Sequence, residues 1–219
     1  MPGMKNIKKR AGACDVEAVE PSNWQKTRIT RQQRLYRAML LPASAALVEQ
    51  RPADAKWFCL NVFDGAELTV ESRLVDGGVK ALVPREKFDK IVKGDKIEGE
   101  RACFTGYVFI RIVPSALAFE RLRRVKGVVD FLHNGERYHT VRDHDLGFYA
   151  DKLNIDRMKA DKTIGDRCEV IIRFGPFAGL ECVVLQVTKP KSREPLARVW
   201  SKLYGREMKN VPLAFMEKV

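Results

Sequence analysis

Apolar and polar positions along the chain follow two different patterns, and the change between them divides the sequence. Continuous apolar and β-branched runs at residues 57–63 and 107–112 predict buried strands. Apolar residues at three- and four-residue spacing predict helices at 66–75, 115–127 and 144–153. After residue 161, short strand-like runs separated by Gly and Pro predict strands without a helix.

The middle of the chain predicts a hairpin and therefore an antiparallel sheet. Residues 93–96 (Lys-Gly-Asp-Lys) are typical of a hairpin tip, and the return strand is predicted to run from Glu100 to Ile112. Along that strand Tyr107 and Phe109 lie on one face and β-branched residues on the other, so one of the two faces need not be core. With helices packed on the sheet, the fold class is α+β.

Local signals set the ends and inner faces of the predicted helices. Thr30 is an N-cap candidate for a helix that Pro42 ends, and Asp64 and Asp143 are N-cap candidates for the helices that follow them. Gly127 is expected to stop the helix at 115–127. The residues predicted to face inward are Leu68, Leu74, Val75, Ala118, Leu122, Val125, Leu146, Tyr149 and Leu153.

These patterns divide the chain into four parts. Residues 1–56 form a partly helical basic extension, residues 57–153 a sheet flanked by helices, residues 154–161 a polar linker, and residues 162–219 a small β-barrel. Gly and Pro interrupt every long helical window of the last part. We therefore expect an independent barrel that does not convert to helices.

Composition adds a strong positive charge to this picture. The 219 residues include 40 Lys and Arg against 28 Asp and Glu, a net charge of +12, which favours a polyanionic partner such as DNA or RNA. The extension at 1–56 carries much of this excess. Within it Arg31, Arg34 and Arg37 recur near one helix face, which we interpret as a solvated face in preference to a nucleic-acid contact.

Several classes of protein are disfavoured. The five cysteines are widely spaced with no Cys-x-x-Cys pair, and the three histidines lack a zinc-binding spacing, so we expect no metal, no disulfides and a reduced, cytoplasmic setting. The apolar stretch at 38–48 is too short to span a membrane, so no membrane partner is expected. No phosphate-binding Gly-rich loop or nucleophile elbow occurs, so we predict no catalytic residues, no cofactor and no enzymatic activity.

Five ordered features resemble the NusG family of bacterial transcription factors, over roughly three quarters of the chain. They are the aromatic strand and Gly turn from Trp57-Phe58 to Phe63-Asp64-Gly65, the element Leu82-Val83-Pro84, the strand Cys103-Phe104-Thr105-Gly106-Tyr107-Val108, the KOW motif from Gly165-Asp166 to Gly175-Pro176-Phe177-Ala178-Gly179, and the closing Tyr204-Gly205-Arg206 with Glu217-Lys218-Val219. Cys103 and Thr105 depart from the usual Phe and Pro, and the 56-residue extension has no counterpart. These departures favour a specialised paralogue of the RfaH type.

The resemblance implies a fold and a function. It implies an NGN-like first domain that docks on the clamp helices of the largest subunit of RNA polymerase and modulates pausing, termination or antitermination. It also implies that the second domain is an SH3-like KOW barrel, which recruits either termination factor Rho or the ribosomal NusE-type protein. Such a protein works through binding energy and not through catalysis.

Candidate site residues follow from the resemblance and from chemistry. Aromatic anchors for a helix pair are expected at Trp57, Phe63, Phe104 and Tyr107, although periodicity alone would place these rings in the core. A basic cluster is expected to contact DNA, RNA or polymerase, or else to be a solvated helix end; it comprises Arg121, Arg123, Arg124 and Lys126, with His139 and Arg142 as further candidates. An exposed tip of the barrel is expected to bind its partner through Leu203, Tyr204 and Arg206, although the same tip would also suit a packed hairpin end.

Two other classes of function remain open at this point. The first alternative is a ribosome-associated, RNA-binding KOW protein, which the positive charge also suits. The second is a nucleic-acid-processing enzyme, which only the positive charge supports. Salt-sensitive binding to naked RNA without polymerase affinity would favour the first alternative, and turnover would favour the second.

Overall fold

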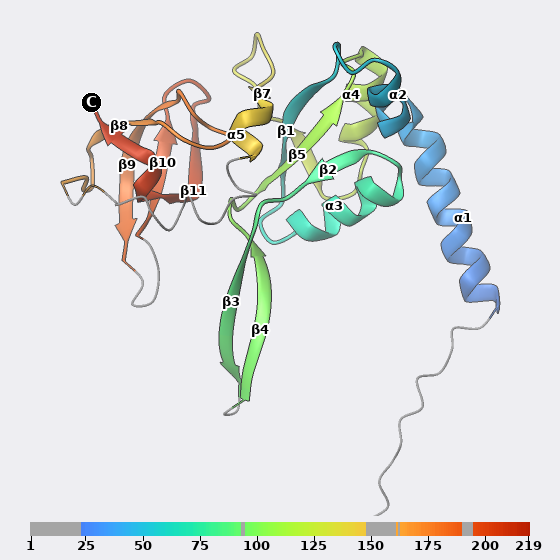
Figure 1. Cartoon of the computed structure of the whole chain (residues 1–219), viewed down its shortest axis with the longest axis horizontal. Helices are drawn as coiled ribbons and strands as arrows, with labels where there is room; N and C mark the ends of the chain where they lie inside the picture. Colours follow the sequence, from blue (N-terminus) through green and yellow to red (C-terminus); the bar gives the residue numbers. More distant parts are fainter. Residues whose placement is uncertain (1–22, 93–94, 148–160, 162, 190–194) are drawn as a thin grey trace, which may run out of the picture.

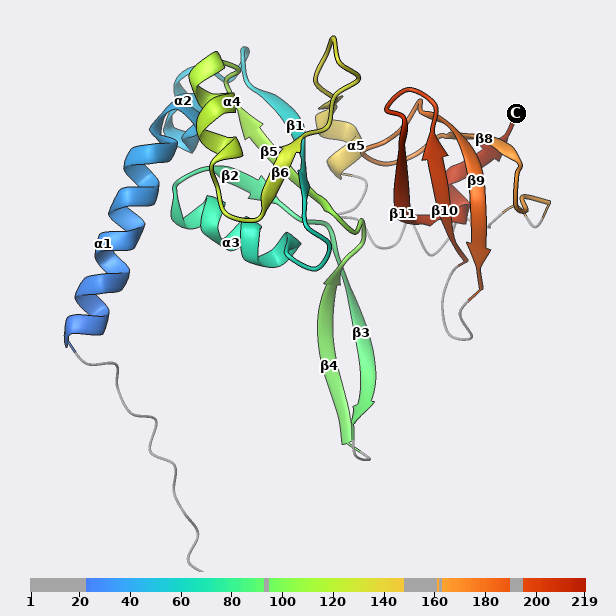
Figure 2. The same ribbon diagram turned by 180° about the vertical axis from the view of Figure 1, so that it is seen from behind.

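A computed structural model describes residues 23–92, 95–147, 161, 163–189 and 195–219 (Figure 1). The described residues form two packed groups, which we call the N-terminal unit (residues 23–147) and the C-terminal unit (residues 161–219). Figures 1 and 2 show the two units side by side, with the N-terminal helix on the side of the N-terminal unit away from the C-terminal unit. None of the described helices is both long and apolar enough to cross a membrane.

The chain enters the N-terminal unit through a long helix. Helix α1 (Asn23–Leu40) is followed by the 3-10 turn η1 (Leu41–Ala43), which contains Pro42, and by α2 (Ala45–Gln50). The end at Pro42 is confirmed, because proline lacks the N–H that would continue the helix. The predicted start at Thr30 is wrong: no Gly or Pro interrupts residues 23–30, so the helix begins about two turns earlier.

The central sheet of the N-terminal unit is antiparallel throughout. Its order is β2 (Lys80–Leu82), β5 (Tyr107–Ile112), β1 (Lys56–Val62) and β6 (Val128–Phe131), and β7 (Thr140–Val141) also pairs with β1. In the register of β1 with β5, Phe58 pairs with Ile110 and Cys59 with Phe109. These two pairs lie on opposite faces of the sheet because side chains alternate along a strand.

One face of this sheet is covered by helices of the same unit. Helices α3 (Glu67–Asp76) and α4 (Ala116–Arg123) and the end of α1 pack on Phe58, Leu60 and the β-branched residues of β5. The predicted inner stripe of α4 is confirmed: Ala118, Leu122 and Val125 are buried, and Ser115 caps the helix by accepting a bond from the Ala118 amide. This face is a conventional apolar core.

Several details of the predicted helices are wrong. In α3, Leu74 is buried, but Val75 is exposed and Leu68 only half-buried, since the helix begins at Glu67 and turns Val75 outward. Asp64 does not cap this helix, because the N-cap position is Ala66. Helix α4 ends at Arg123, short of Gly127, and α5 (Asp143–Gly147) starts at Asp143 itself.

A two-stranded hairpin extends from the N-terminal unit. Strands β3 (Arg85–Val92) and β4 (Asp95–Ala102) form a separate sheet, and both views show it extending away from the body (Figures 1 and 2). The prediction of one continuous return strand is wrong. Strand β4 ends at Ala102, and the chain turns at Gly106, whose positive φ of 85° breaks the strand before β5 begins.

The C-terminal unit is a five-stranded antiparallel sheet in the order β11-β10-β9-β8-β12. The strands are β8 (Glu169–Ile172), β9 (Glu181–Thr188), β10 (Leu196–Ser201), β11 (Arg206–Pro212) and β12 (Met216–Lys218), with the 3-10 turn η2 (Leu213–Phe215) before the last. Its described residues contain no α-helix, as the sequence predicts. The predicted inward residues Tyr149 and Leu153, most of the predicted linker at 154–161, and the hairpin tip itself lie outside the described residues.

The two units share one buried apolar cluster, so the C-terminal unit packs on the N-terminal unit while its described residues keep the predicted strands. The second face of the central sheet, with Cys59 and Phe109, belongs to the same cluster as Phe177, Val199 and Met208 of the C-terminal unit. The physical reason lies in β1 and β5, which are apolar on both faces. Helices cover one face, and the C-terminal unit lies against the other.

Candidate functional site

Four aromatic residues form one surface on the second face of the central sheet. Trp57 lies on β1, Tyr107 and Phe109 lie on β5, and Phe104 lies in the turn before β5. We call these four residues the aromatic patch. All four are buried, with Phe104 only 2% and Tyr107 only 4% exposed.

The side chain that covers the aromatic patch comes from the C-terminal unit. The ring of Phe177 lies 5.2 Å from that of Phe104, 5.1 Å from that of Tyr107 and 5.9 Å from that of Phe109, measured between centroids. The contacts with Phe104 and Tyr107 are edge-to-face, which the charge distribution of aromatic rings favours. Burial of the patch therefore depends on a residue at least 68 positions further along the chain.

A tight turn presents Phe177 to the patch. Gly175 and Gly179 both have positive φ, at 83° and 90°, and the Gly179 amide donates to the carbonyl of Ile172. Only glycine adopts such angles without strain, so the two glycines bring the chain round with Phe177 near the middle of the turn. From sequence alone, Phe177 is named only within the KOW motif and is missed as a contact. The sequence did contain a signal for this contact, namely a large aromatic side chain within a turn. A side chain in such a position is usually either exposed to solvent or buried in an interface.

His139 joins the two units beside Phe177. Its ring stacks on Phe177 at 5.8 Å, its Nε2 lies 2.8 Å from the carbonyl oxygen of Pro176, and its Nδ1 lies 2.7 Å from the hydroxyl of Tyr204. A carbonyl only accepts, so Nε2 carries the hydrogen, and in the neutral ring Nδ1 accepts from the Tyr204 hydroxyl. Burial lowers the pKa of His139, while the Pro176 carbonyl and Asp145 oppose that shift.

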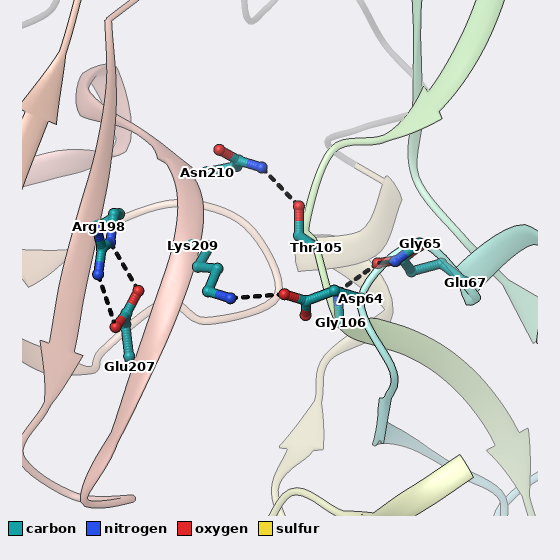
Figure 3. A network of polar contacts seen from close by, with 9 residues as sticks. All are labelled: Asp64, Gly65, Glu67, Thr105, Gly106, Arg198, Glu207, Lys209 and Asn210. Carbon is teal, nitrogen blue, oxygen red and sulfur yellow. Dashed lines mark hydrogen bonds and ion pairs between the residues drawn. The ribbon is translucent and has the colours of Figure 1, made fainter. Parts of the chain in front are cut away.

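Polar contacts surround the buried rings on the side of β11. The ammonium group of Lys209 lies 2.6 Å from Asp64 Oδ2, and Asn210 Nδ2 donates to Thr105 Oγ1 at 2.6 Å (Figure 3). On the N-terminal side, Glu67 Oε1 accepts from the backbone amide of Gly106 at 2.6 Å, which holds the turn that carries Thr105. We call the pairs Lys209–Asp64 and Asn210–Thr105 the polar rim.

A groove of about 610 Å³ opens at this rim between the units. Phe63 lines it and is 64% exposed, so Phe63 is the one predicted aromatic anchor that reaches solvent. Tyr107 and Arg206 also line it. The structure therefore brings Phe104 and Tyr107 together under Phe177 and leaves Phe63 at the edge.

Trp57 has a specific polar partner. Its indole Nε1 donates to Asp143 Oδ1 at 2.8 Å, and Arg111 lies 3.4 Å from the same carboxylate oxygen. Asp143, predicted as a helix cap, thus also fixes the orientation of Trp57. This bond is structural and supports the edge of the aromatic patch.

The predicted basic cluster is largely neutralised. Arg123 pairs with Asp130 at 2.6 Å and lies over the ring of Phe131, and Arg124 pairs with Glu120. Arg142 pairs with Asp145 at 2.7 Å. Within the part of the chain that the structure describes, Arg121 and Lys126 have no ion pair with a carboxylate.

The three predicted partner-binding residues of the C-terminal unit lie in different environments. Leu203 is exposed, whereas Tyr204 turns inward to His139, and its burial raises its pKa to about 12. Arg206 lines the groove. Sequence reasoning treated His139 and Tyr204 as contacts to different partners, but in the structure they contact each other.

The described residues offer little metal or thiol chemistry. Among them no three His, Cys, Asp or Glu side chains lie together as a metal site. Cys59, Cys103, Cys168 and Cys182 are free thiols, and burial raises the pKa of Cys59 well above its ordinary value. Among the described residues, the two units are joined by apolar and aromatic packing, by hydrogen bonds and by the ion pair of Lys209 with Asp64.

Comparison with known proteins identifies relatives of this arrangement. Residues 55–147 match the family described as "Transcription termination factor nusG". A Synechocystis protein named "Transcription termination/antitermination protein NusG" is 25% identical over 73% of this chain and 86% of its own length. The protein of the same name from Escherichia coli K12 is 26% identical over 69% of this chain and 88% of its own.

Among solved structures, similarity is found to "Domain interaction in Thermotoga maritima NusG", with 20% identity, a TM-score of 0.39 and coverage of 75% of this chain and 97% of that one. Similarity is also found to "Crystal Structure of MjSpt4:Spt5 complex conformation A", with 15% identity, a TM-score of 0.24 and coverage of 74% and 97%. TM-scores this low carry no argument about how the two units are arranged.

Proposed function

Because the chain is a member of the NusG-type family, we propose that it is a transcription elongation factor that binds RNA polymerase and modulates pausing, termination or antitermination. The family match at 55–147 spans the whole central sheet with α3 and α4, and the named relatives are termination/antitermination proteins. The function is one of binding: the candidate site consists of aromatic rings and supports recognition of a protein surface.

The surface proposed to bind polymerase is the aromatic patch, with Phe63 at its edge. A pair of helices, such as the clamp helices of the largest subunit, would insert apolar side chains between rings like Phe104 and Tyr107. This proposal rests on the origin of the side chain that covers the patch. Three of its rings, those of Phe104, Tyr107 and Phe109, are covered by Phe177 of another unit.

Polymerase binding at this surface requires the C-terminal unit to move away. We call the arrangement with Phe177 on the patch the docked state. In the docked state Phe177 occupies the place that a partner's side chain would fill, so the C-terminal unit and polymerase compete for the same rings. The polar rim and His139 set part of the free energy of that competition.

The C-terminal unit is proposed to be an SH3-like KOW barrel with a partner of its own, either Rho or a NusE-type ribosomal protein. Exposed Leu203 is available to such a partner in the docked state, but Tyr204 is not, because it is bonded to His139. Release of the C-terminal unit would expose Tyr204 and the aromatic patch together. Binding of the second partner is thus coupled to polymerase binding.

The remaining basic residues are proposed as secondary contacts. Arg121 and Lys126 lack acidic partners among the described residues and could approach phosphates or polymerase without breaking an ion pair. Arg123, Arg124 and Arg142 would first have to leave their carboxylates. The proposal therefore assigns Arg121 and Lys126 the larger role.

Co-purification of RNA polymerase with the tagged full-length protein tests this function. The Phe104→Ala, Tyr107→Ala double variant is expected to lose polymerase, and Phe177→Ala is expected to retain more than the wild type because it weakens docking. Trp200→Ala, which removes an exposed ring far from the patch, serves as control and is expected to behave as wild type. A double variant that retains polymerase fully would refute the patch, and RNA binding without polymerase would favour the ribosome-associated alternative.

A further inference from the structure

Helix α1 carries a feature that the proposed function does not use. It lies outside the matched family segment at 55–147, and its 18 residues include five basic side chains and no acidic one. Both views place it on the side of the N-terminal unit opposite the C-terminal unit, with its first half extending beyond the body (Figures 1 and 2). Its charge is therefore presented away from the docked interface.

The helix has one packed face and one basic face. Tyr36, Met39 and Leu40 pack against the core of the N-terminal unit. Arg31, Arg34 and Arg37 are exposed, and at 100° per residue they follow one another in steps of about 60° on the opposite side. These three residues, which we call the α1 arginines, span about 9 Å of helix.

The α1 arginines lie together on one helix face and, in the described part of the chain, lack the carboxylate partners that several other surface arginines have. Arg173, Arg198 and Arg123 each form an ion pair with a carboxylate. Among the described residues no carboxylate pairs with Arg31 or Arg34. Arg37 donates to the backbone carbonyl of Asp76 at 3.1 Å, which orients its guanidinium group without cancelling its charge.

We propose that the basic face of α1 binds the phosphate backbone of duplex DNA. Duplex DNA carries one negative charge per about 1.7 Å of its axis, so the span of the α1 arginines meets several phosphates, and each contact releases condensed counterions. Arginine is suited to this because its planar guanidinium group donates two parallel bonds to one phosphate. This proposal replaces the interpretation of these residues as a solvated face, because three exposed arginines without a carboxylate partner in the described part of the chain follow one another on the same side of the helix.

Duplex DNA fits this face better than single-stranded RNA or a membrane. Proteins that hold single strands stack bases on exposed aromatic rings, whereas Tyr36, the ring that lies among the α1 arginines, is packed on the core. A membrane-binding helix inserts an apolar face, but here that face is used within the protein. A straight basic face on a helix anchored to a folded unit is suited to the outside of a duplex.

The test is fluorescence anisotropy of a labelled 20-base-pair duplex with the full-length protein, without polymerase. The Arg31→Gln, Arg34→Gln variant is expected to bind at least about tenfold more weakly at 0.1 M salt, and its log–log salt dependence to be shallower by about 1.8, as two lost phosphate contacts require. Glutamine is close to arginine in helix propensity, so α1 is preserved, which circular dichroism checks.

The matched control is Arg173→Gln, Arg198→Gln, which removes the same charge from two arginines that are ion-paired, and it is expected to bind DNA as the wild type does. Equal weakening by both variants, or an unchanged salt slope, would overturn the proposal in favour of a diffuse charge effect. Equally tight binding to single-stranded RNA, or to vesicles with anionic lipids, would overturn the assignment to duplex DNA. The assay contains no polymerase, so its failure is separate from failure of the proposed function.

Discussion

The two faces of the central sheet are both apolar and both buried, but they are covered in different ways. On the first face Phe58, Phe119 and Phe131 pack edge-to-face among helices of the same unit. On the second face the covering ring, Phe177, comes from the C-terminal unit and is accompanied by polar contacts at His139 and Lys209. Burial alone therefore does not separate a structural core from a binding surface.

The difference lies in what happens when the covering element leaves. Helices α3 and α4 belong to the N-terminal unit, so exposing the first face means unfolding that unit. The C-terminal unit has its own five-stranded sheet, and under the proposed function it leaves as a folded unit. When the units separate, the polar groups of the second interface form hydrogen bonds to water in place of those they lose. The net free energy lost by breaking these polar contacts is therefore small.

The largest expected effect is on the first face. Leu122→Ala removes a fully buried side chain of α4 and is expected to lower the free energy of unfolding by about 2–5 kcal/mol, measured by urea denaturation. Leu117→Ala on the same helix, where the side chain is exposed, is expected to change it by less than about 0.5 kcal/mol. Equal effects of the two changes would contradict the assignment of this face as structural core.

The next effect is on the second face. Phe177→Ala is expected to weaken docking by up to about 3–5 kcal/mol while both sheets stay folded, because the ring contacts the other unit more than its own turn. NMR relaxation should then show the two units tumbling separately. Phe174→Ala, at an exposed ring before the same turn, is the control. Loss of the dispersed amide spectrum of the C-terminal unit would show instead that Phe177 is a core residue of that unit.

A smaller effect is expected from pH. Because burial lowers the pKa of His139 below its ordinary value of 6.5 in the docked state, the released state binds more protons at mildly acidic pH. The contribution of His139 to the free energy of docking is therefore fully present above the ordinary pKa and is lost progressively as pH falls through and below that value. His139→Gln should remove this dependence between pH 7 and pH 5, with the docked fraction followed by the same NMR relaxation. A pH response unchanged by the substitution would assign it to other groups, Asp145 among them.

The sequence predicted those parts of the fold that depend on local pattern. The alternation along β5 and the apolar stripe of α4 were sufficient to predict the strand and the helix. The break between β4 and β5 was missed, because Cys103 and Phe104 continue an apolar run and only the positive φ of Gly106 interrupts it. A glycine's backbone angle is set by its surroundings, which the local pattern does not contain.

The sequence predicted which aromatic residues form the candidate site, but not which residues of the chain they contact. The rings of Phe104 and Tyr107 were identified, whereas the contact with Phe177 was not, since no periodicity links residues that far apart. The same limit applies to charge: Arg123 and Arg142 carry positive charge in the sequence, and only the fold brings Asp130 and Asp145 against them. Which basic residues remain free, as on α1, is therefore information that only the structure supplies.

The smallest expected effect tests whether the polar rim adds to docking at all. Lys209→Met removes the ion pair with Asp64, in which both side chains are about half exposed. An exposed pair of this kind contributes about 0.2–1 kcal/mol and is screened by salt, so the docked fraction should fall slightly at 0.05 M salt and not at 0.5 M. Lys202→Met, which breaks an ion pair with Glu169 inside the C-terminal unit, is the control. If Lys209→Met released the unit as fully as Phe177→Ala does, the aromatic contact would not be the main source of docking, and the contrast between the two faces would rest on electrostatics.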